Sequence, residues 1–120
     1  MESETKTPDR MIASDRVEGT AVYNKDDERL GTIERFMVDK VSGQVEYAVM
    51  GFGGLFGLGN RHYPLPWNAL TYDPNRGGYV VSLTRDQMSE APSYDPEGEQ
   101  PTYDREYGER IYGYYGFTYM

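Results

Sequence analysis

Short runs of alternating apolar and polar residues dominate the first two thirds of the chain, which is the pattern of β-strands rather than of helices. These runs are rich in Val, Ile, Thr, Tyr and Phe, and clusters of Gly, Pro, Asn and Asp separate them. They predict strands over residues 20–24, 29–40, 44–52, 70–73 and 78–83. Pro74 and Gly77 mark a tight turn between the last two strands.

Three of the extended segments have individual features. Residues 29–40 carry polar side chains on both faces, so we expect this strand to bend or to change the face it buries midway. Residues 44–52 are mostly apolar on both faces, which predicts a central, buried strand. Residues 61–67 include Pro64 and Pro66, which have no backbone N–H, and this predicts an edge strand or an extended segment.

Helical signals appear only in the last third of the chain. Thr84 and Gln87 have the spacing of a capping box, which predicts a short helix that Pro92 would stop. Further on, one apolar residue recurs at every fourth position and forms a single helical stripe, made of Tyr103, Tyr107, Ile111 and Tyr115. Gly108 and Gly113 each cost such a helix about 1 kcal/mol relative to Ala, so we expect it to form only if it docks.

These patterns divide the chain into four parts. Residues 1–10 are polar and are expected to be disordered, and residues 11–92 are expected to form one compact domain. Residues 93–101 are expected to be a linker, followed by a tyrosine-rich segment over 102–120. About five or six strands within about 70 residues predict a small closed or half-closed β-barrel. The expected fold class is therefore mainly β, with a short helix and a partly helical C-terminal extension.

Composition narrows the range of functions. The formal net charge is −8 and the basic residues are not clustered, so nucleic-acid binding is not expected. The absence of cysteine excludes disulfides, a thiolate nucleophile and cysteine-ligated metal, and fits a reducing cytoplasm. The N-terminus lacks the apolar stretch of a signal peptide, and no apolar run reaches the length of about 18 residues that a membrane span needs. We therefore expect a cytoplasmic protein.

The chain shows no patterned set of catalytic or metal-binding residues. His62 is the single histidine, and its neighbours supply neither a nucleophile nor an orienting group, so we interpret it as a structural or surface residue. Asn24, Asp26 and Glu28 alternate as at the start of a calcium loop, but Arg29 stands where the glycine is required. A solvated turn is the better interpretation, and no catalytic residue, metal site or cofactor is expected.

The glycine-rich run at residues 51–59 carries three large apolar side chains, Leu55, Phe56 and Leu58. It is not a dinucleotide-binding fingerprint, because Phe56 occupies the position of the third glycine and no helix follows. Either the loop folds back onto the barrel, or it exposes an apolar tip to a partner or to a second copy. The tyrosine stripe also leaves three possibilities: a helix that caps its own barrel, a dimer arm, or a disordered tail.

Several stretches of the chain resemble the PRC-barrel family. The resemblance runs from about Ile12 to Leu83 and rests on Gly19–Asn24, Leu30–Glu34, Val38–Lys40, Ser42–Val45, Tyr47–Val49 and, most specifically, Phe52–Gly59 followed by Tyr63–Leu70. The family includes the cytoplasmic domain of the photosynthetic reaction-centre H subunit and the C-terminal domain of the 16S rRNA maturation factor. The resemblance implies a protein-contact module with no catalytic motif, similar to stand-alone bacterial members with tyrosine-rich tails.

We therefore expect a non-enzymatic protein-interaction or assembly module that self-associates as a homodimer. The candidate contact residues are Leu55, Phe56 and Leu58 in the glycine-rich loop and Tyr103, Tyr107, Ile111 and Tyr115 in the tail. One alternative, by analogy with the family, is an adaptor for a membrane-associated or ribosomal complex. Another is a small ligand-binding or hydrolytic barrel that uses Asp15, Glu34 or Asp39.

Overall fold

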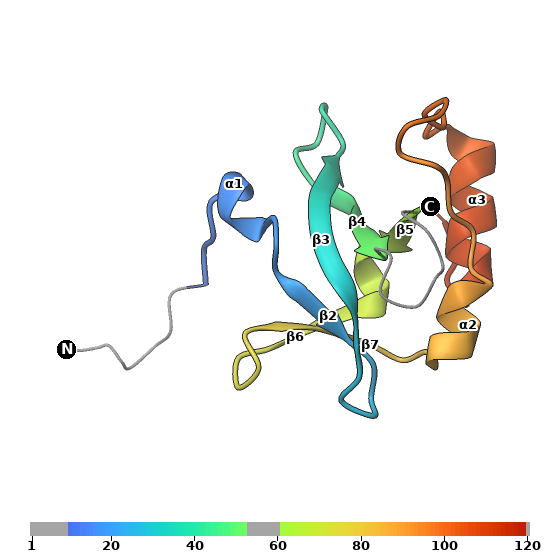
Figure 1. The fold of residues 1–120 in the computed structure, drawn as a ribbon. Helices are drawn as coiled ribbons and strands as arrows, with labels where there is room; N and C mark the ends of the chain where they lie inside the picture. The colour runs from blue at the N-terminus through green and yellow to red at the C-terminus, as the bar shows by residue number, and fades with distance from the viewer. Residues whose placement is uncertain (1–9, 53–60, 120) are drawn as a thin grey trace.

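The computed structural model describes residues 10–52 and 61–119, and a curled sheet forms the centre of that part of the chain (Figure 1). In chain order the elements are α1 (Ser14–Val17), β2 (Ala21–Tyr23), β3 (Arg29–Val38), β4 (Val45–Phe52), β5 (Arg61–Pro66), the 3₁₀-helix η1 (Trp67–Ala69), β6 (Leu70–Asp73), β7 (Gly78–Val81), α2 (Arg85–Ser89) and α3 (Arg105–Tyr114). The predicted fold class is confirmed, including the partly helical C-terminal extension.

The described strands form one six-stranded sheet in the order β5-β4-β3-β2-β7-β6. Neighbours pair antiparallel except β2 and β7, which pair parallel through Val22 with Tyr79 and Tyr23 with Val80. This parallel pair joins the first strand to the last hairpin and curls the sheet into a half-barrel. No helix in the described ranges is long and apolar enough to cross a membrane.

Strand β3 changes the face it buries, as the sequence predicts. The pairing with β4 shifts register between Ile33 and Arg35, which leaves Glu34 as an extra, bulged residue. Ile33 and Phe36, three positions apart, consequently both pack in the inner core of the half-barrel. A strand without a bulge would place these two side chains on opposite faces.

Strand β4 is buried on both faces, which confirms the prediction of a central strand. Ala48 and Met50 point into the inner core, whereas Tyr47 packs in a second apolar cluster on the outer face of the sheet. Its neighbour β5 is an edge strand, as its two prolines predict. His62 exchanges backbone hydrogen bonds with Tyr94 (2.9 and 3.0 Å) along the edge away from β4.

Pro64 and Pro66 lie two and four positions after His62, so their backbone nitrogens also face the outer edge and leave the pairing with β4 intact.

The turn and helix cap predicted from the sequence are confirmed as well. Gly77 adopts a φ of 67° in the turn between β6 and β7, which favours glycine. Thr84 and Gln87 form the reciprocal capping box of α2, and the helix ends at Ser89, before Pro92.

Candidate functional site

Helix α3 has well-formed hydrogen-bonded caps at both ends. Asp104 accepts a hydrogen bond from the backbone of Tyr107 (2.9 Å) at the N-terminus. At the other end Gly116 has a φ of 85°, and the backbone N–H of Phe117 donates to the carbonyl of Tyr112 (2.9 Å). This is a Schellman motif, which reverses the chain. The reversed chain places the ring of Tyr119 next to Gly108 of α3.

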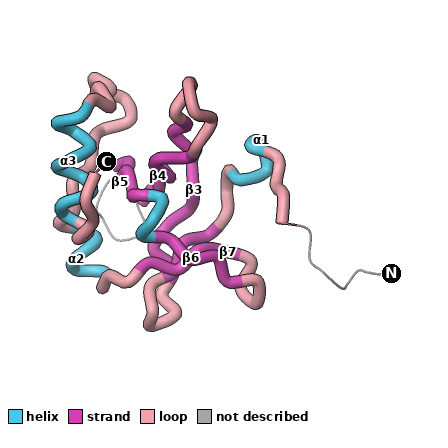
Figure 2. The backbone as a smooth tube through the Cα atoms, turned by 180° about the vertical axis from the view of Figure 1, so that it is seen from behind, coloured by secondary structure: helices cyan, strands magenta, loops and turns pink. Residues whose placement is uncertain are grey.

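Helix α3 lies against the outer side of the sheet, next to β5 (Figures 1 and 2). Ile111 is fully buried there, and the ring of Tyr112 meets the ring of Tyr47 edge to face at 5.6 Å. The hydroxyl of Tyr112 donates a hydrogen bond to the backbone carbonyl of Glu46 (2.6 Å). The predicted helix therefore forms and packs on the barrel of its own chain.

Aromatic rings fill most of this contact, and together we call them the tyrosine cluster: Tyr47, Tyr103, Tyr107, Tyr112, Tyr115 and Tyr119. Successive rings meet edge to face, at 5.0 Å for Tyr47 with Tyr103 and 5.1 Å for Tyr103 with Tyr107. Such pairs contribute about 0.5–1.5 kcal/mol beyond the area they bury. The cluster joins α3, the segment before it and β4 into one apolar layer.

Gly108 has a role that the sequence does not reveal. A Cβ atom at this position would lie 2.5 Å from the ring of Tyr119, so the glycine makes room for that ring against the helix. From the sequence it is only a cost to helix formation. Tyr47 and Tyr119 are likewise missing from the predicted contact residues. Tyr112, the buried neighbour of Ile111, could have been found, because it lies three positions before Tyr115 of the predicted stripe and residues at that spacing share a side of a helix.

The structure places the predicted contact residues in two different situations. The stripe of Tyr103, Tyr107, Ile111 and Tyr115 is the apolar side of the C-terminal segment, and it packs within the chain. Its contact with a partner stays a prediction. The predicted tip made of Leu55, Phe56 and Leu58 lies outside the described residues.

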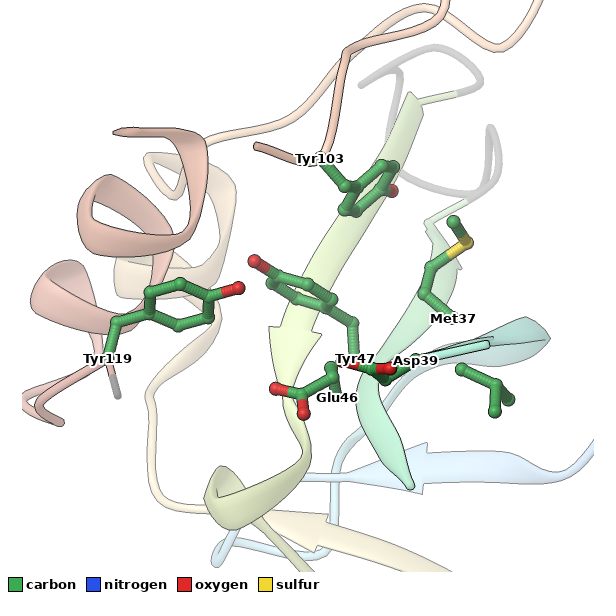
Figure 3. A pocket seen from close by; sticks show the side chains of 7 residues that line it. Met37, Asp39, Glu46, Tyr47, Tyr103 and Tyr119 are labelled. Atoms are coloured by element: carbon green, nitrogen blue, oxygen red, sulfur yellow. The ribbon is translucent and has the colours of Figure 1, made fainter. Parts of the chain in front are cut away.

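A cleft of about 130 Å³ opens beside the tyrosine cluster, between the end of the β3–β4 hairpin and the C-terminal segment (Figure 3). Its lining residues are Met37, Val38, Asp39, Glu46, Tyr47, Tyr103 and Tyr119. Tyr47 is only 3% exposed and directs its hydroxyl toward that of Tyr119. The hydroxyls of Tyr47 and Tyr103 are both buried and lie next to the hydroxyls of Tyr119 and Tyr94, respectively.

Two carboxylates give the cleft a negative rim. Asp39 accepts hydrogen bonds from the backbone N–H groups of Val41 (2.8 Å) and Ser42 (3.0 Å), which shape the hairpin turn. These bonds, that from Ser42 above all, hold the pKa of Asp39 below its ordinary value, so it is ionised at neutral pH. Among residues 10–52 and 61–119, neither Asp39 nor Glu46 forms an ion pair with a basic side chain.

Comparison with known proteins identifies the barrel. Residues 9–88 match the family model of the PRC-barrel domain. The chain belongs to the PRC-barrel domain family. The predicted resemblance is thereby confirmed. Helix α3 lies beyond the matched residues, so the tyrosine cluster joins the PRC-barrel domain, through Tyr47, to its C-terminal extension.

Among solved structures, one match to this PRC-barrel protein is RimM from Pseudomonas aeruginosa, described as a 16S ribosomal RNA processing protein. The two are 20% identical in sequence, and the TM-score is 0.42. The match covers 62% of this chain and 45% of RimM, so the chain spans less than half the length of that protein. Curated protein sequences gave no match.

The structure of the PRC-barrel domain separates the three carboxylates of the hydrolytic alternative. Asp15 lies in α1, Glu34 is the bulged residue of β3, and Asp39 lies in the turn after that strand. Glu34 and Asp39 are five positions apart in an extended segment, which corresponds to roughly 16 Å. Glu34 instead lies over Gly51, whose Cβ would come within 2.4 Å of its carboxylate.

His62 is a buried residue of the β5 edge, where its ring meets that of Tyr94 edge to face at 5.6 Å. Burial lowers the pKa of its imidazole below the ordinary value, with the carboxylate of Glu34 acting in the opposite direction. The imidazole is therefore neutral at pH 7. These contacts support the interpretation of His62 as a structural residue.

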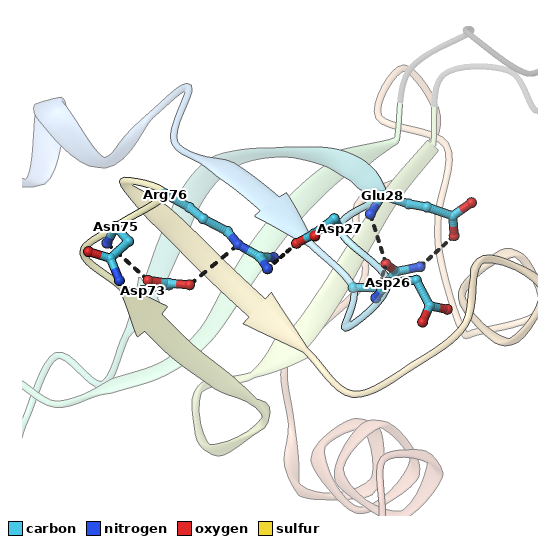
Figure 4. A network of polar contacts seen from close by, with 7 residues as sticks. Asp26, Asp27, Glu28, Asp73, Asn75 and Arg76 are labelled. Carbon is cyan, nitrogen blue, oxygen red and sulfur yellow. Dashed lines mark hydrogen bonds and ion pairs between the residues drawn. The ribbon is translucent and has the colours of Figure 1, made fainter.

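The turn at Asn24 and the neighbouring turn of β6 and β7 form a polar network (Figure 4). Asn24 is fully buried, and its side chain accepts hydrogen bonds from the backbone of Asp26 (2.9 Å) and Glu28 (3.0 Å). It is thus a turn, as predicted, although Asn24 itself is buried rather than solvated. Arg76 pairs with both Asp27 and Asp73 and connects this turn to the β6–β7 hairpin.

Alkaline pH is expected to release α3 from the PRC-barrel domain. Burial, followed by the charge of Glu46, raises the pKa of Tyr112 from its ordinary value of 10 to about 12. Burial also raises the pKa values of Tyr47, Tyr103 and Tyr115. Because the folded state holds these protons more tightly than the unfolded state, their contribution is complete below pH 10 and is lost as the pH rises toward 12.

Tyrosinate absorbance and far-ultraviolet circular dichroism, followed together during the titration, would measure this release. We expect the helical signal to fall in the same pH interval in which the buried tyrosines ionise. Complete ionisation of all tyrosines with an unchanged helical signal would contradict the packing of α3 described above.

Proposed function

We propose that this PRC-barrel protein is a non-enzymatic protein-interaction module that assembles with a second copy of itself. The proposed contact face is the end of the β3–β4 hairpin together with the cleft beside the tyrosine cluster. The observation that carries the proposal is that Val38 and Val41 expose 51% and 92% of their surface next to this cleft. Membership of the PRC-barrel family supports a non-catalytic role.

The chemistry of this face is that of a protein contact. The core of a protein interface favours aromatic residues and Met, and the lining of the cleft provides three tyrosines and Met37. Complete burial of an exposed valine side chain contributes about 1.5–3 kcal/mol, so covering Val38 and Val41 would help to hold two copies together. In a two-fold dimer the same face of each copy meets the other, and one surface is then sufficient.

Solution mass, measured by light scattering over a range of protein concentrations, tests the proposal. The test variant combines Val38→Thr with Val41→Glu, which adds a charge that would face its own copy across the two-fold axis. The matched control is Ile12→Glu, at an exposed apolar position in the segment before α1. We expect a dimer for the parent and the control, and for the test variant a monomer with an unchanged circular dichroism spectrum.

Two results would contradict different parts of the proposal. A parent chain that stays monomeric at all concentrations would exclude self-association. A dimer that survives the combined substitution would show that the copies meet through another surface.

A further inference from the structure

The segment that joins α2 to α3, residues 90–104, is attached to β5 by an isolated β-bridge, and we call this segment the strap. The backbone of Tyr94 donates a hydrogen bond to the backbone of His62 (3.0 Å) and accepts one from it (2.9 Å). A side-chain hydrogen bond from Arg61 to the hydroxyl of Ser93 (2.7 Å) accompanies the bridge. These contacts hold the strap against the edge of the sheet.

Tyr94 links this bridge to the tyrosine cluster. Its ring meets the imidazole of His62 edge to face at 5.6 Å. Its hydroxyl lies next to that of Tyr103, and the ring of Tyr103 packs on the rings of Tyr47 and Tyr107. The bridge at His62 and the contact between α3 and the PRC-barrel domain are therefore parts of one continuous structure.

The surroundings of His62 suit only the neutral form of its imidazole. The residue is 8% exposed, and its Nδ1 atom is buried with no hydrogen-bond partner among the described residues. Protonation places an N–H on both ring nitrogens, so the imidazolium would hold a buried donor that has no acceptor. It would also hold a buried positive charge, and both are unfavourable in the interior of a protein.

The charges that act on His62 come mainly from β3. Burial is the largest influence on the pKa of the imidazole and lowers it. The carboxylate of Glu34 acts in the opposite direction, and the guanidinium of Arg35 adds to the effect of burial. On β4 the residue opposite His62 is Gly51, and residues 53–60 contain no titratable side chain.

The other titratable or charged residues beside His62 or Tyr94, in sequence or in space, are Arg61 and Tyr63 on β5, Asp95 and Tyr103 on the strap, and Tyr107 on α3. Phenols carry no charge in acid, and the guanidinium of Arg61 adds positive charge. Asp95 is exposed, and its carboxylate accepts a hydrogen bond from the backbone of Glu97 (2.9 Å). Glu34 is thus the carboxylate that favours the imidazolium.

We propose that protonation of His62 opens its bridge to Tyr94, so that mild acid releases the strap and loosens α3 from the PRC-barrel domain. The imidazolium is solvated when it leaves the interior, and the backbone of His62 leaves the bridge with it. Release would also remove Tyr103 from the lining of the cleft. This acid response goes beyond the proposed self-association and does not depend on it.

The direction of the pH dependence follows from the lowered pKa of the buried imidazole. The folded state binds this proton less readily than the open state, in which the pKa of histidine has its ordinary value of 6.5. The contribution of His62 to the stability of the bridge is therefore complete above that pH. It is lost as the pH falls from there through the lower pKa of the buried ring.

NMR spectroscopy of the full chain tests the proposal. His62 is the single histidine, so its Cε1–H signal reports protonation without ambiguity. Exchange of the backbone N–H groups of His62 and Tyr94, corrected for the intrinsic effect of pH, measures opening of the bridge. We expect the opening constant to rise on the order of tenfold from about pH 7.5 to about pH 5. The N–H of Ile33, bonded to Thr20 within the barrel (2.8 Å), is expected to keep its opening constant.

Two variants identify the group responsible. His62→Phe keeps an aromatic ring against Tyr94 but cannot be protonated, so we expect the N–H of Tyr94 to open equally at both pH values. Glu34→Gln removes the carboxylate that favours the imidazolium and is expected to enlarge the rise in acid. Glu18→Gln, at an exposed position after α1, is the matched control and is expected to behave as the parent does.

An acid-induced opening that persists in His62→Phe would overturn the proposal. An imidazole that titrates in the folded parent at or above its ordinary pKa would overturn it as well, and this measurement needs no variant. Equal opening at Tyr94 and Ile33 would show that acid unfolds the barrel as a whole, which excludes selective release of the strap. A parent chain that is monomeric in light scattering leaves all of these expectations unchanged.

Discussion

Replacement of Gly31 by alanine is expected to destabilise the domain by about 3 kcal/mol. A Cβ atom at this position would lie 2.2 Å from the backbone oxygen of Gly51 on β4 and 3.1 Å from the Cγ of Met50. The obstructing oxygen belongs to the backbone, so it cannot turn away as the end of a side chain could. Strands β3 and β4 would have to separate at the centre of the sheet.

Chemical denaturation, followed by circular dichroism, would measure the decrease in the free energy of unfolding that Gly31→Ala causes. Gly113→Ala is the matched control, because a Cβ atom there would meet nothing within 4 Å. Gly113 lies in the last turn of α3, where alanine is the better helix former. Gly113→Ala is therefore expected to leave the free energy of unfolding unchanged or to raise it by up to about 1 kcal/mol. Equal stability of the two variants would show that β3 and β4 do not approach each other this closely.

Replacement of Ile111 by alanine is expected to cost about 3 kcal/mol, since large-to-small changes at fully buried positions remove 2–5 kcal/mol. Ile111 packs with Tyr47 and Tyr112 where α3 meets the sheet. Two glycines weaken α3, and isolated helices of its length are marginal in water. We therefore expect the variant to lose helical signal before the sheet unfolds.

Thermal unfolding monitored in the far ultraviolet would show this early loss of helix. Ile12→Ala, at an exposed position, is the control and is expected to change stability by less than about 0.5 kcal/mol. The experiment also distinguishes packing within the chain from exchange between copies. In the background of Val38→Thr with Val41→Glu, which removes the proposed contact between copies, an α3 that packs on its own barrel gives a temperature of helix loss that is independent of protein concentration. An exchanged helix would make this temperature rise with concentration.

Features that depend on neighbouring residues could be predicted from the sequence. Pro74 and Gly77 determine the turn between β6 and β7, and Thr84 with Gln87 determines the start of α2. The alternating patterns locate the strands for the same reason, because a strand and its buried face are properties of a short stretch of chain. The bend of β3 is predicted only in outline, since the pairing with β4 decides that Glu34 is the bulged residue.

The candidate site depends on contacts between distant residues, and so most of it could not be predicted. Tyr47 is one apolar residue of a buried strand until α3 is placed on its outer face. Gly108 acquires its role only after the Schellman motif returns Tyr119 to the helix. The cleft requires the hairpin end and the C-terminal segment to lie together. The stripe was predictable because it is a periodic pattern in one short stretch of chain, although α3 includes only Tyr107 and Ile111 of its four residues.

The parallel pairing of β2 with β7 has a consequence for the order of folding. Val22 pairs with Tyr79, so this contact closes a loop on the order of 60 residues, whereas the β3–β4 hairpin closes a short one. The entropy lost on closing the long loop places this step late, after the local hairpins have formed. Arg76 contacts Asp27 only once β2 and β7 have paired, whereas Asp73 belongs to the same hairpin as Arg76. The ion pair between Arg76 and Asp27 therefore slows unfolding rather than accelerating folding.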